Sequence, residues 1–318
     1  MASLPPYAVA LAHGIHVIDT GFHRPLFDAS YLIVENGRAA FVDTGTNHAV
    51  PRLLGTLEAL GLARDAVDFV IPTHVHLDHA GGVGALMQQL PNAVAWVHPR
   101  GARHMIDPSA LVAGATAVYG AEEIERSYGR IVGVPAERVR ETADGLTIAL
   151  AGRPLTFFDT PGHARHHHCI WDERSRGFFT GDTFGLSYRE FDTAQGPWLL
   201  PTTTPVQFEP AALRTSVQRL LSFEPQAMYL THYGRVQDVQ RLGAQLLVQL
   251  DELVALGRSL HGVTDRHTRL KQGLLDIYVA RARSHGCSLT PAEVGDLLGV
   301  DTELNAQGIA IWLDKEAA

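Results

Sequence analysis

Hydrophobic residues in the first half of the chain fall mainly in short runs of strand length, separated by turn residues. The stretch SYLIVENGRAAFVDTG, residues 30–45, has an apolar run on each side of Asn36-Gly37, a pair that favours a tight hairpin turn. The run DFVIP, residues 68–72, predicts another strand, whereas apolar residues recur at helical spacing over residues 49–62. Strands and helices therefore alternate in this half.

The second half repeats this order of elements up to about residue 235. Strands are expected around 140–163, a hairpin over 167–184, a helix over 210–223 and a strand over 226–234. Two similar halves that mix strands with helices predict two packed sheets with helices outside them. The expected fold class is therefore α/β, an αββα sandwich of two mixed sheets.

Beyond residue 235 the pattern becomes helical. Long amphipathic stretches cover residues 236–260 and 266–286, and a shorter helix is expected over 290–299, with Pro291 at its start. We therefore expect a first domain over residues 1–235 and a helical C-terminal extension over residues 236–318. Residues 100–150 look less regular, apart from a helix near 121–133.

The composition argues against some classes of binding partner. The chain has 318 residues and a formal net charge of −8, which argues against binding a nucleic-acid backbone. Its longest apolar runs have strand length, so no membrane partner is expected. The N-terminus lacks a signal-peptide pattern, and the expected compartment is the cytoplasm. Cys169 and Cys287 are too few for a disulfide framework.

The stretch THVHLDHAGG contains an unusual concentration of ligand side chains. His74 and His76 are two residues apart on an extended segment and point to the same side. Asp78 and His79 follow as the chain turns. Such nitrogen and oxygen ligands suit divalent metals.

Three later residues each follow an apolar run and precede turn residues. They are His163 in DTPGHARHHH, Asp182 in FFTGDTF and His232 in MYLTHYG. Ligands presented from strand ends along one edge of a sheet would meet at one place, as they usually do in active sites.

The order of these motifs resembles that of the metallo-β-lactamase superfamily over about residues 10–235. The resemblance implies an αββα metal-binding catalytic domain with two metal sites. The ligands it implies for the first metal are His74, His76 and His163. Those it implies for the second are Asp78, His79 and His232.

The resemblance also implies a bridging role for Asp182 between the metals and a supporting role beneath them for Asp43 in FVDTG. Seven ligands are too many for one tetrahedral ion. The expected cofactors are two divalent metal ions, with zinc favoured and iron or manganese as alternatives. Aspartate at 182, where one subclass of true β-lactamases has cysteine, resembles the glyoxalase II and lactonase branch.

The implied activity is that of a dinuclear metal-dependent hydrolase. A metal-bridging hydroxide would attack an ester, thioester or lactone carbonyl of a small-molecule substrate. Asp78 is expected to act in catalysis as well as in metal binding, by orienting the hydroxide or moving a proton. Tyr188 and Tyr233 are candidate substrate contacts.

Other functions remain open at this point. The same ligand set suits a phosphodiesterase, a di-iron redox protein, or a partner-binding protein in which the metals only stabilise the fold. The amphipathic helices after residue 235 are compatible with a homodimer. The run His166–His168 is expected to support the ligands or the packing, whereas His98 and His104 are expected in loop positions as surface or packing residues.

Overall fold

The computed structural model describes residues 3–316, except for the side chains of residues 118 and 119. The chain forms two compact units, each assembled from three segments. Unit 1 contains the chain up to Asp159, His166–Gly181 and Gln226–Gln237. Unit 2 contains Thr160–Arg165, Asp182–Pro225 and the chain from Asp238 onward. The helical extension expected from residue 236 thus shares its unit with residues 182–225, where the sequence suggested one boundary at 235.

The first sheet of unit 1 has seven strands that lie in chain order. They are β1 (Ala8–Ala10), β2 (Ile15–Asp19), β3 (Ala29–Glu35), β4 (Arg38–Val42), β5 (Val67–Ile71), β6 (Val94–Val97) and β7 (Val139–Glu141). Neighbours from β1 to β4 are antiparallel, and those from β4 to β7 are parallel. Glu35 pairs with Arg38 across the Asn36-Gly37 turn, in which both residues have positive φ, so the predicted hairpin is confirmed.

The second sheet of unit 1 has six strands in the order β13-β12-β11-β10-β9-β8. They are β8 (Thr147–Leu150), β9 (Arg153–Asp159), β10 (His168–Asp172), β11 (Gly177–Gly181), β12 (Ala227–Leu230) and β13 (Gly234–Val236). Only the β11–β12 pair is parallel. Both sheets are therefore mixed, as expected.

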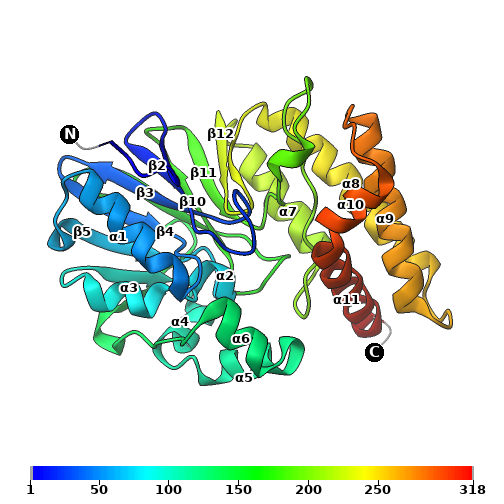
Figure 1. Cartoon of the computed structure of the whole chain (residues 1–318), viewed down its shortest axis with the longest axis horizontal. Helices are drawn as coiled ribbons and strands as arrows, with labels where there is room; N and C mark the ends of the chain where they lie inside the picture. Colours follow the sequence, from blue (N-terminus) through cyan, green and yellow to red (C-terminus); the bar gives the residue numbers. More distant parts are fainter. Residues whose placement is uncertain (1–2, 317–318) are drawn as a thin grey trace. The chain divides into compact units, whose positions relative to one another are not determined.

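Alternation along each strand separates two cores. Leu32 and Phe41 point to the helical side of the first sheet, where they pack with Leu53 of α1 (Val50–Ala59) and Leu86 of α3 (Val83–Gln89). Figure 1 shows α1 and α3 on the same side of this sheet, where α1 contacts β2 and β3 and α3 contacts β6. The helices close this face of the sheet because most of the side chains that its strands direct toward them are apolar.

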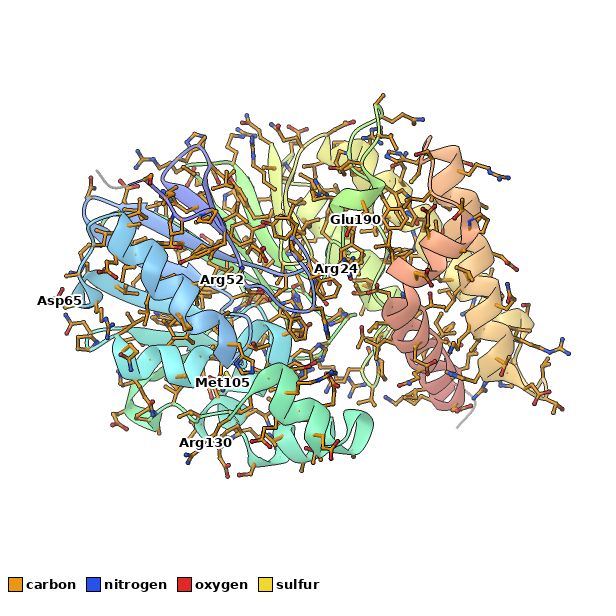
Figure 2. The ribbon with its side chains drawn as sticks, in the orientation of Figure 1. Arg24, Arg52, Asp65, Met105, Arg130 and Glu190 are labelled. Atoms are coloured by element: carbon orange, nitrogen blue, oxygen red, sulfur yellow. The ribbon has the colours of Figure 1, made fainter. Side chains whose placement is uncertain are left out.

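The opposite face of the first sheet packs on the second sheet. Ile33 and Ile71 share a buried cluster with Phe157, Ile170 and Phe179. Asp65, in contrast, is exposed, and Figure 2 shows it at the periphery of unit 1. The helix–sheet–sheet order of layers in unit 1 is thus fixed by strand periodicity.

Residues 98–133 are more helical than the sequence suggested. The remaining helices of unit 1 are α2 (Leu77–Ala80), α4 (Pro99–Ile106), α5 (Ser109–Tyr119), α6 (Ala121–Tyr128) and the short 3-10 turns η1 (Asn47–Ala49), η2 (Arg64–Ala66) and η3 (Ala136–Arg138). His104 lies within α4, so the loop position expected for it was wrong. His98 caps this helix, because its side chain accepts a hydrogen bond from the backbone N–H of Arg100.

Unit 2 is predominantly helical. Its helices are η4 (Arg189–Phe191), α7 (Pro210–Leu221), α8 (Val239–Ser259), α9 (Arg266–Ser284), α10 (Pro291–Leu297) and α11 (Gly299–Glu316). Pro291 starts α10 as expected, and Thr290 forms a capping box with Glu293. The structure adds α11, which the sequence pattern did not predict. None of the described helices is both long and apolar enough to cross a bilayer.

Candidate metal centre

The carboxyl ends of parallel strands β4 and β5 bring the first candidate residues to one edge of the sheet. Asp43 directly follows β4, and Thr73 and His74 follow β5 after Pro72 ends that strand. Polar groups placed outside the carboxyl ends of parallel strands are a common arrangement for binding sites. The chain then turns through His76 into the short helix α2, which carries Asp78 and His79.

Asp43 is buried and accepts hydrogen bonds from three directions. Its Oδ1 accepts from the backbone N–H of Thr73 at 2.7 Å, and its Oδ2 accepts from the Thr231 hydroxyl at 2.6 Å. His79 Nδ1 lies 3.0 Å from Oδ2. A carboxylate only accepts, so His79 donates from Nδ1 and keeps the lone pair of its Nε2 for another partner. Carboxylate–histidine pairs of this kind orient metal ligands in proteins.

Asp78, His79 and His232 form one group of potential ligands within unit 1. Their ligand atoms all lie within 4.8 Å of one another. Asp78 Oδ2 is 3.4 Å from His232 Nε2 and 3.8 Å from His79 Nε2. His232 Nδ1 donates to the Phe27 carbonyl at 3.0 Å, so its Nε2 also presents a lone pair.

The spacing of this group suits a metal ion. Ligand atoms bound about 2.0–2.1 Å from a tetrahedral Zn²⁺ lie about 3.3–3.4 Å from one another. The observed separations of 3.4 and 3.8 Å come close to that value. Two imidazole nitrogens and a carboxylate oxygen are also the donor types that zinc and similar divalent metals accept. The residues present therefore fit a divalent metal.

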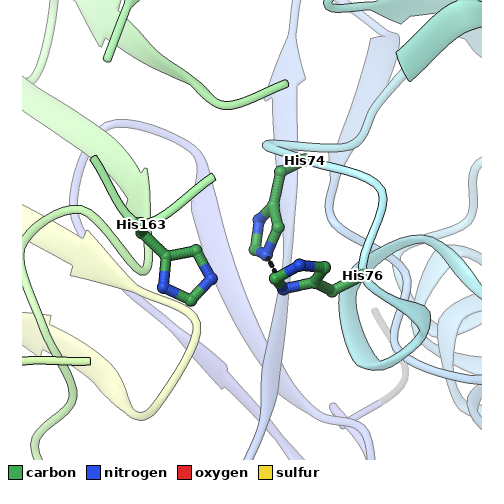
Figure 3. A group of neighbouring side chains, drawn as sticks. All are labelled: His74, His76 and His163. Carbon is green, nitrogen blue, oxygen red and sulfur yellow. Dashed lines mark hydrogen bonds between the residues drawn. The ribbon is translucent and has the colours of Figure 1, made fainter. Parts of the chain in front are cut away.

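His74 and His76 form a second pair in unit 1. His74 Nε2 lies 2.9 Å from His76 Nδ1, and Figure 3 shows the two rings joined at these atoms. The Thr73 hydroxyl lies 3.0 Å from Asp43 Oδ1 and 3.2 Å from His74 Nδ1. Because its single proton goes to the carboxylate, Thr73 accepts from His74 Nδ1–H, which leaves the lone pair on His74 Nε2.

Unit 2 contains the two remaining predicted ligands. His163, the third side chain drawn in Figure 3, has its Nε2 3.4 Å from Asp182 Oδ2. The Thr202 hydroxyl lies 2.8 Å from His163 Nδ1 and donates to the Asp182 carbonyl at 3.3 Å. Thr202 therefore accepts from His163 Nδ1–H, and His163 Nε2 faces the Asp182 carboxylate with its lone pair.

Three buried titratable groups of unit 1 have shifted pKa values. Burial raises the pKa of Asp28 to about 7, although His232 and His79 counteract the shift. Burial lowers the pKa of His166 to about 3 and that of His168 to about 3. The Asp28 carboxyl group therefore remains protonated up to near neutral pH, and the imidazoles of His166 and His168 are neutral. In each case the low-dielectric interior disfavours the charged form.

The two candidate substrate contacts are both buried. The Tyr188 hydroxyl donates to Asp301 at 3.1 Å within unit 2. Tyr233 is 7% exposed and belongs to the apolar cluster between the two sheets of unit 1. These surroundings favour packing roles for both tyrosines, and their contact with substrate stays a prediction.

The sequence reasoning missed three threonines that orient ligands. Thr73 and Thr231 each contact Asp43, and Thr202 contacts His163. A signal for two of them was present, since an apolar run followed by Thr-His occurs at both IPTH and MYLTH. Thr202 in LLPTTTP had no comparable signal.

Comparison with known proteins gives consistent matches. A family model described as the Metallo-beta-lactamase superfamily matches residues 23–232. The hydroxyacylglutathione hydrolase of Salmonella typhi is 29% identical over 163 residues, which cover 50% of this chain and 49% of that protein. The chain spans about half the length of the hydroxyacylglutathione hydrolases that it matches. The Metallo-beta-lactamase fold-containing protein ST1585 of Sulfurisphaera tokodaii is 22% identical over 236 residues, covering 70% of this chain and 79% of that one.

Among solved structures, the metallo-beta-lactamase family protein TTHA1429 of Thermus thermophilus shares the fold with a TM-score of 0.69 and 22% identity. The similarity covers 97% of this chain and 96% of that chain. The family model spans more than half of the chain and includes strands of both sheets, together with Asp43 and the seven predicted ligand residues. The chain belongs to the metallo-β-lactamase superfamily.

Proposed function

We propose that this protein is a dinuclear metal-dependent hydrolase that cleaves an ester, thioester or lactone bond of a small-molecule substrate. The observation that carries the proposal is the group formed by Asp78, His79 and His232, with Asp43 behind it. The proposal is supported by three ligand atoms at metal-binding spacing, two of them on imidazoles whose Nε2 lone pairs are fixed by hydrogen bonds at Nδ1.

The second metal is proposed to use His74, His76 and His163, with Asp182 shared between the two ions. The order of elements along the chain supports this assignment. Asp182 directly follows Gly181, the last residue of β11, and His163 lies between β9 and β10. The hydrogen bonds of two of these histidines also support the assignment. Thr73 contacts His74 Nδ1 and Thr202 contacts His163 Nδ1, so that the Nε2 of each ring is available as a ligand atom. Zinc is the proposed metal.

A divalent metal bound here would supply a water of lowered pKa and polarise an acyl oxygen. The chain itself supplies the groups around that chemistry. Asp78 is 26% exposed at its side chain and stands between His79 and His232, so it can accept a proton as well as bind metal. Asp43 holds His79 in one tautomer throughout, because its carboxylate also accepts from Thr73 and Thr231.

The choice of acyl substrates rests on similarity. The hydroxyacylglutathione hydrolases, named for cleaving a thioester, are about 29% identical over half of this chain. Thioesters are therefore proposed first, followed by oxygen esters and lactones. Phosphodiesters are the informative negative substrate, because a two-metal centre can also support their cleavage.

The test compares wild-type protein with His79→Ala and with the control His104→Ala, which changes a histidine of α4 outside the ligand set. We expect about two metal ions per wild-type and control chain. We expect His79→Ala to bind less metal and to lose activity on a panel of thioesters, esters and lactones. Bis-(p-nitrophenyl) phosphate should be a poor substrate. A metal-free wild-type protein, or one that prefers the phosphodiester, would refute the proposal.

A further inference from the structure

His168 is a fully buried histidine at the start of β10 that belongs to neither proposed ligand set. It is the last of three successive histidines, His166–His168, which follow the segment carrying His163. Its ring packs beside Phe157, with 5.0 Å between ring centroids. A buried imidazole needs partners for both nitrogens, and the identity of those partners indicates what it holds in place.

Both ring nitrogens of His168 are hydrogen-bonded to residues that directly follow strands of the first sheet. Its Nε2 lies 3.0 Å from the Pro72 carbonyl, and its Nδ1 lies 2.9 Å from the Thr142 hydroxyl. A carbonyl only accepts, so Nε2 carries the proton, and the Thr142 hydroxyl donates to Nδ1. Pro72 follows β5 and Thr142 follows β7, so one ring connects the carboxyl ends of two parallel strands.

The backbone of His168 adds a third bond to the same place. Its N–H donates to the Thr73 carbonyl at 2.9 Å. The start of β10 is therefore hydrogen-bonded to Pro72 and Thr73, the two residues immediately before His74. This is a contact between the two sheets at the point where the ligand-bearing turn begins.

Thr73 passes this constraint directly to the metal centre. Its backbone N–H and hydroxyl both donate to Asp43, and its hydroxyl accepts from His74. Asp43 in turn orients His79. A shift of Pro72 and Thr73 would therefore move or re-orient side chains in both proposed metal sites.

We propose that His168 is a positioning residue for the metal centre, which holds the Pro72–Thr73 backbone so that His74 and Asp43 keep their metal-binding orientation. This inference rests on the proposed metal-dependent function. It assigns His168 no contact with substrate or metal. Outer groups that orient metal ligands typically change metal affinity by about 10–100-fold when they are removed.

The decisive variants remove the hydrogen bonds and leave the volume. His168→Leu removes both side-chain bonds, and His168→Gln retains one donor and one acceptor as the conservative replacement. Thr142→Val removes only the hydroxyl that donates to Nδ1. His16→Leu is the matched control, since His16 is another buried histidine, on β2 of the same unit.

The readouts are the zinc dissociation constant, measured by competition with a chromophoric chelator, and the visible spectrum of the cobalt(II)-substituted protein. We expect His168→Leu to weaken zinc binding by about tenfold or more and to change the cobalt spectrum. His168→Gln should recover most of the affinity, and Thr142→Val should lie between the two. His16→Leu should lower stability without changing the affinity of the folded protein.

Affinity and spectrum unchanged from wild type in folded His168→Leu, or in Thr142→Val if His168→Leu does not fold, would overturn the positioning role. A loss of affinity in His16→Leu equal to that in His168→Leu would also overturn it, because the effect would then reflect general destabilisation. Wild-type protein that binds no zinc would instead refute the metal-dependent function.

Discussion

Asp28 combines complete burial with an ionisable carboxyl group, and this makes it a source of pH-dependent stability. Burial raises its pKa to about 7 in the folded protein, against 3.8 for an exposed aspartate. As the pH rises from about 4 to about 7, the unfolded chain releases this proton while the folded chain retains it. The metal-free protein should therefore lose about 4 kcal/mol of stability across that range from this group.

Asp28→Asn isolates the contribution, because the variant cannot ionise at this position. The free energy of unfolding of metal-free protein, measured in urea at several pH values, should fall for wild type relative to the variant between pH 4 and 7. Above pH 7 the difference should become constant. Asp65→Asn, at an exposed site, is the control and should show no comparable divergence. A wild-type curve parallel to that of Asp28→Asn would contradict the assignment.

At the scale of residues, the sequence revealed the side chains whose type and spacing are distinctive. The run from His74 to His79 and the strand-end positions of His163 and His232 were visible because few other residues supply metal ligands. Asp28 was not recognisable, since its altered pKa arises from burial that only the folded chain creates. The same applies to Thr202, whose role depends on its distance from His163.

Strands β9 and β10 are joined by a buried ion pair that lies outside the candidate metal centre. Arg153 Nε donates to Asp172 Oδ1 at 2.8 Å, a second guanidinium nitrogen donates to Oδ2, and a third donates to the His13 carbonyl. Both side chains of the pair are almost fully buried. Arg153→Met would leave the Asp172 charge uncompensated and should cost about 3–5 kcal/mol of unfolding free energy.

Adding Asp172→Leu to Arg153→Met should restore part of this loss, because the pair is then replaced by apolar groups. The exposed pair of Arg126 and Glu123 on α6 is the comparison, and Arg126→Met should cost less than about 1 kcal/mol. Urea unfolding measures all three variants. An Arg153→Met cost as small as that of Arg126→Met would show that the buried pair is not a major contributor.

At the scale of elements, hairpins and amphipathic helices were predicted well, and helices packed on several sides were not. The Asn36-Gly37 turn fixes its hairpin locally through positive φ at both residues. Helix α11 buries small and polar residues together with apolar ones, so it lacks a clear apolar stripe. Buried Asn305 has its amide hydrogen-bonded to the Thr203 backbone and the Tyr278 hydroxyl, which compensates for its burial. At Gly308 the chain passes so close to Thr203 that an added Cβ would overlap the Thr203 carbonyl.

Each of the two units is made of segments that are separated in the sequence, and the proposed metal ligands are distributed over both units. Five of them belong to unit 1, while His163 and Asp182 belong to unit 2. Asp182→Ala therefore tests whether unit 2 contributes to metal binding. We expect this variant to lose at least one metal ion per chain and to lose activity by orders of magnitude, because a shared carboxylate serves both ions.

Asp192→Ala is the matched control, since it removes another carboxylate from the same unit outside the ligand set. Elemental analysis of the purified variants gives the metal content, and the acyl substrate panel gives the activity. An Asp182→Ala protein with the metal content and turnover of wild type would exclude the bridging role.

At the scale of the molecule, the sequence predicted the sandwich and the helical C-terminal region. It did not predict that residues 160–165 and 182–225 group with those helices. Strand and helix patterns are local properties, whereas membership of a compact unit depends on contacts between residues far apart in the chain. A pattern along the sequence therefore suggests a single boundary even where the fold passes repeatedly from one unit to the other.

The carboxylate of Asp43 is bonded to Thr73 after β5 and to Thr231 after β12, so it joins the ends of two different sheets. For protein design, this means that the ligand set is not the smallest portable part of the molecule. A scaffold given the same histidines on a single sheet would have no second layer to hold that carboxylate, and its imidazoles could rotate. The transferable element is the junction between the layers, and any graft has to include it.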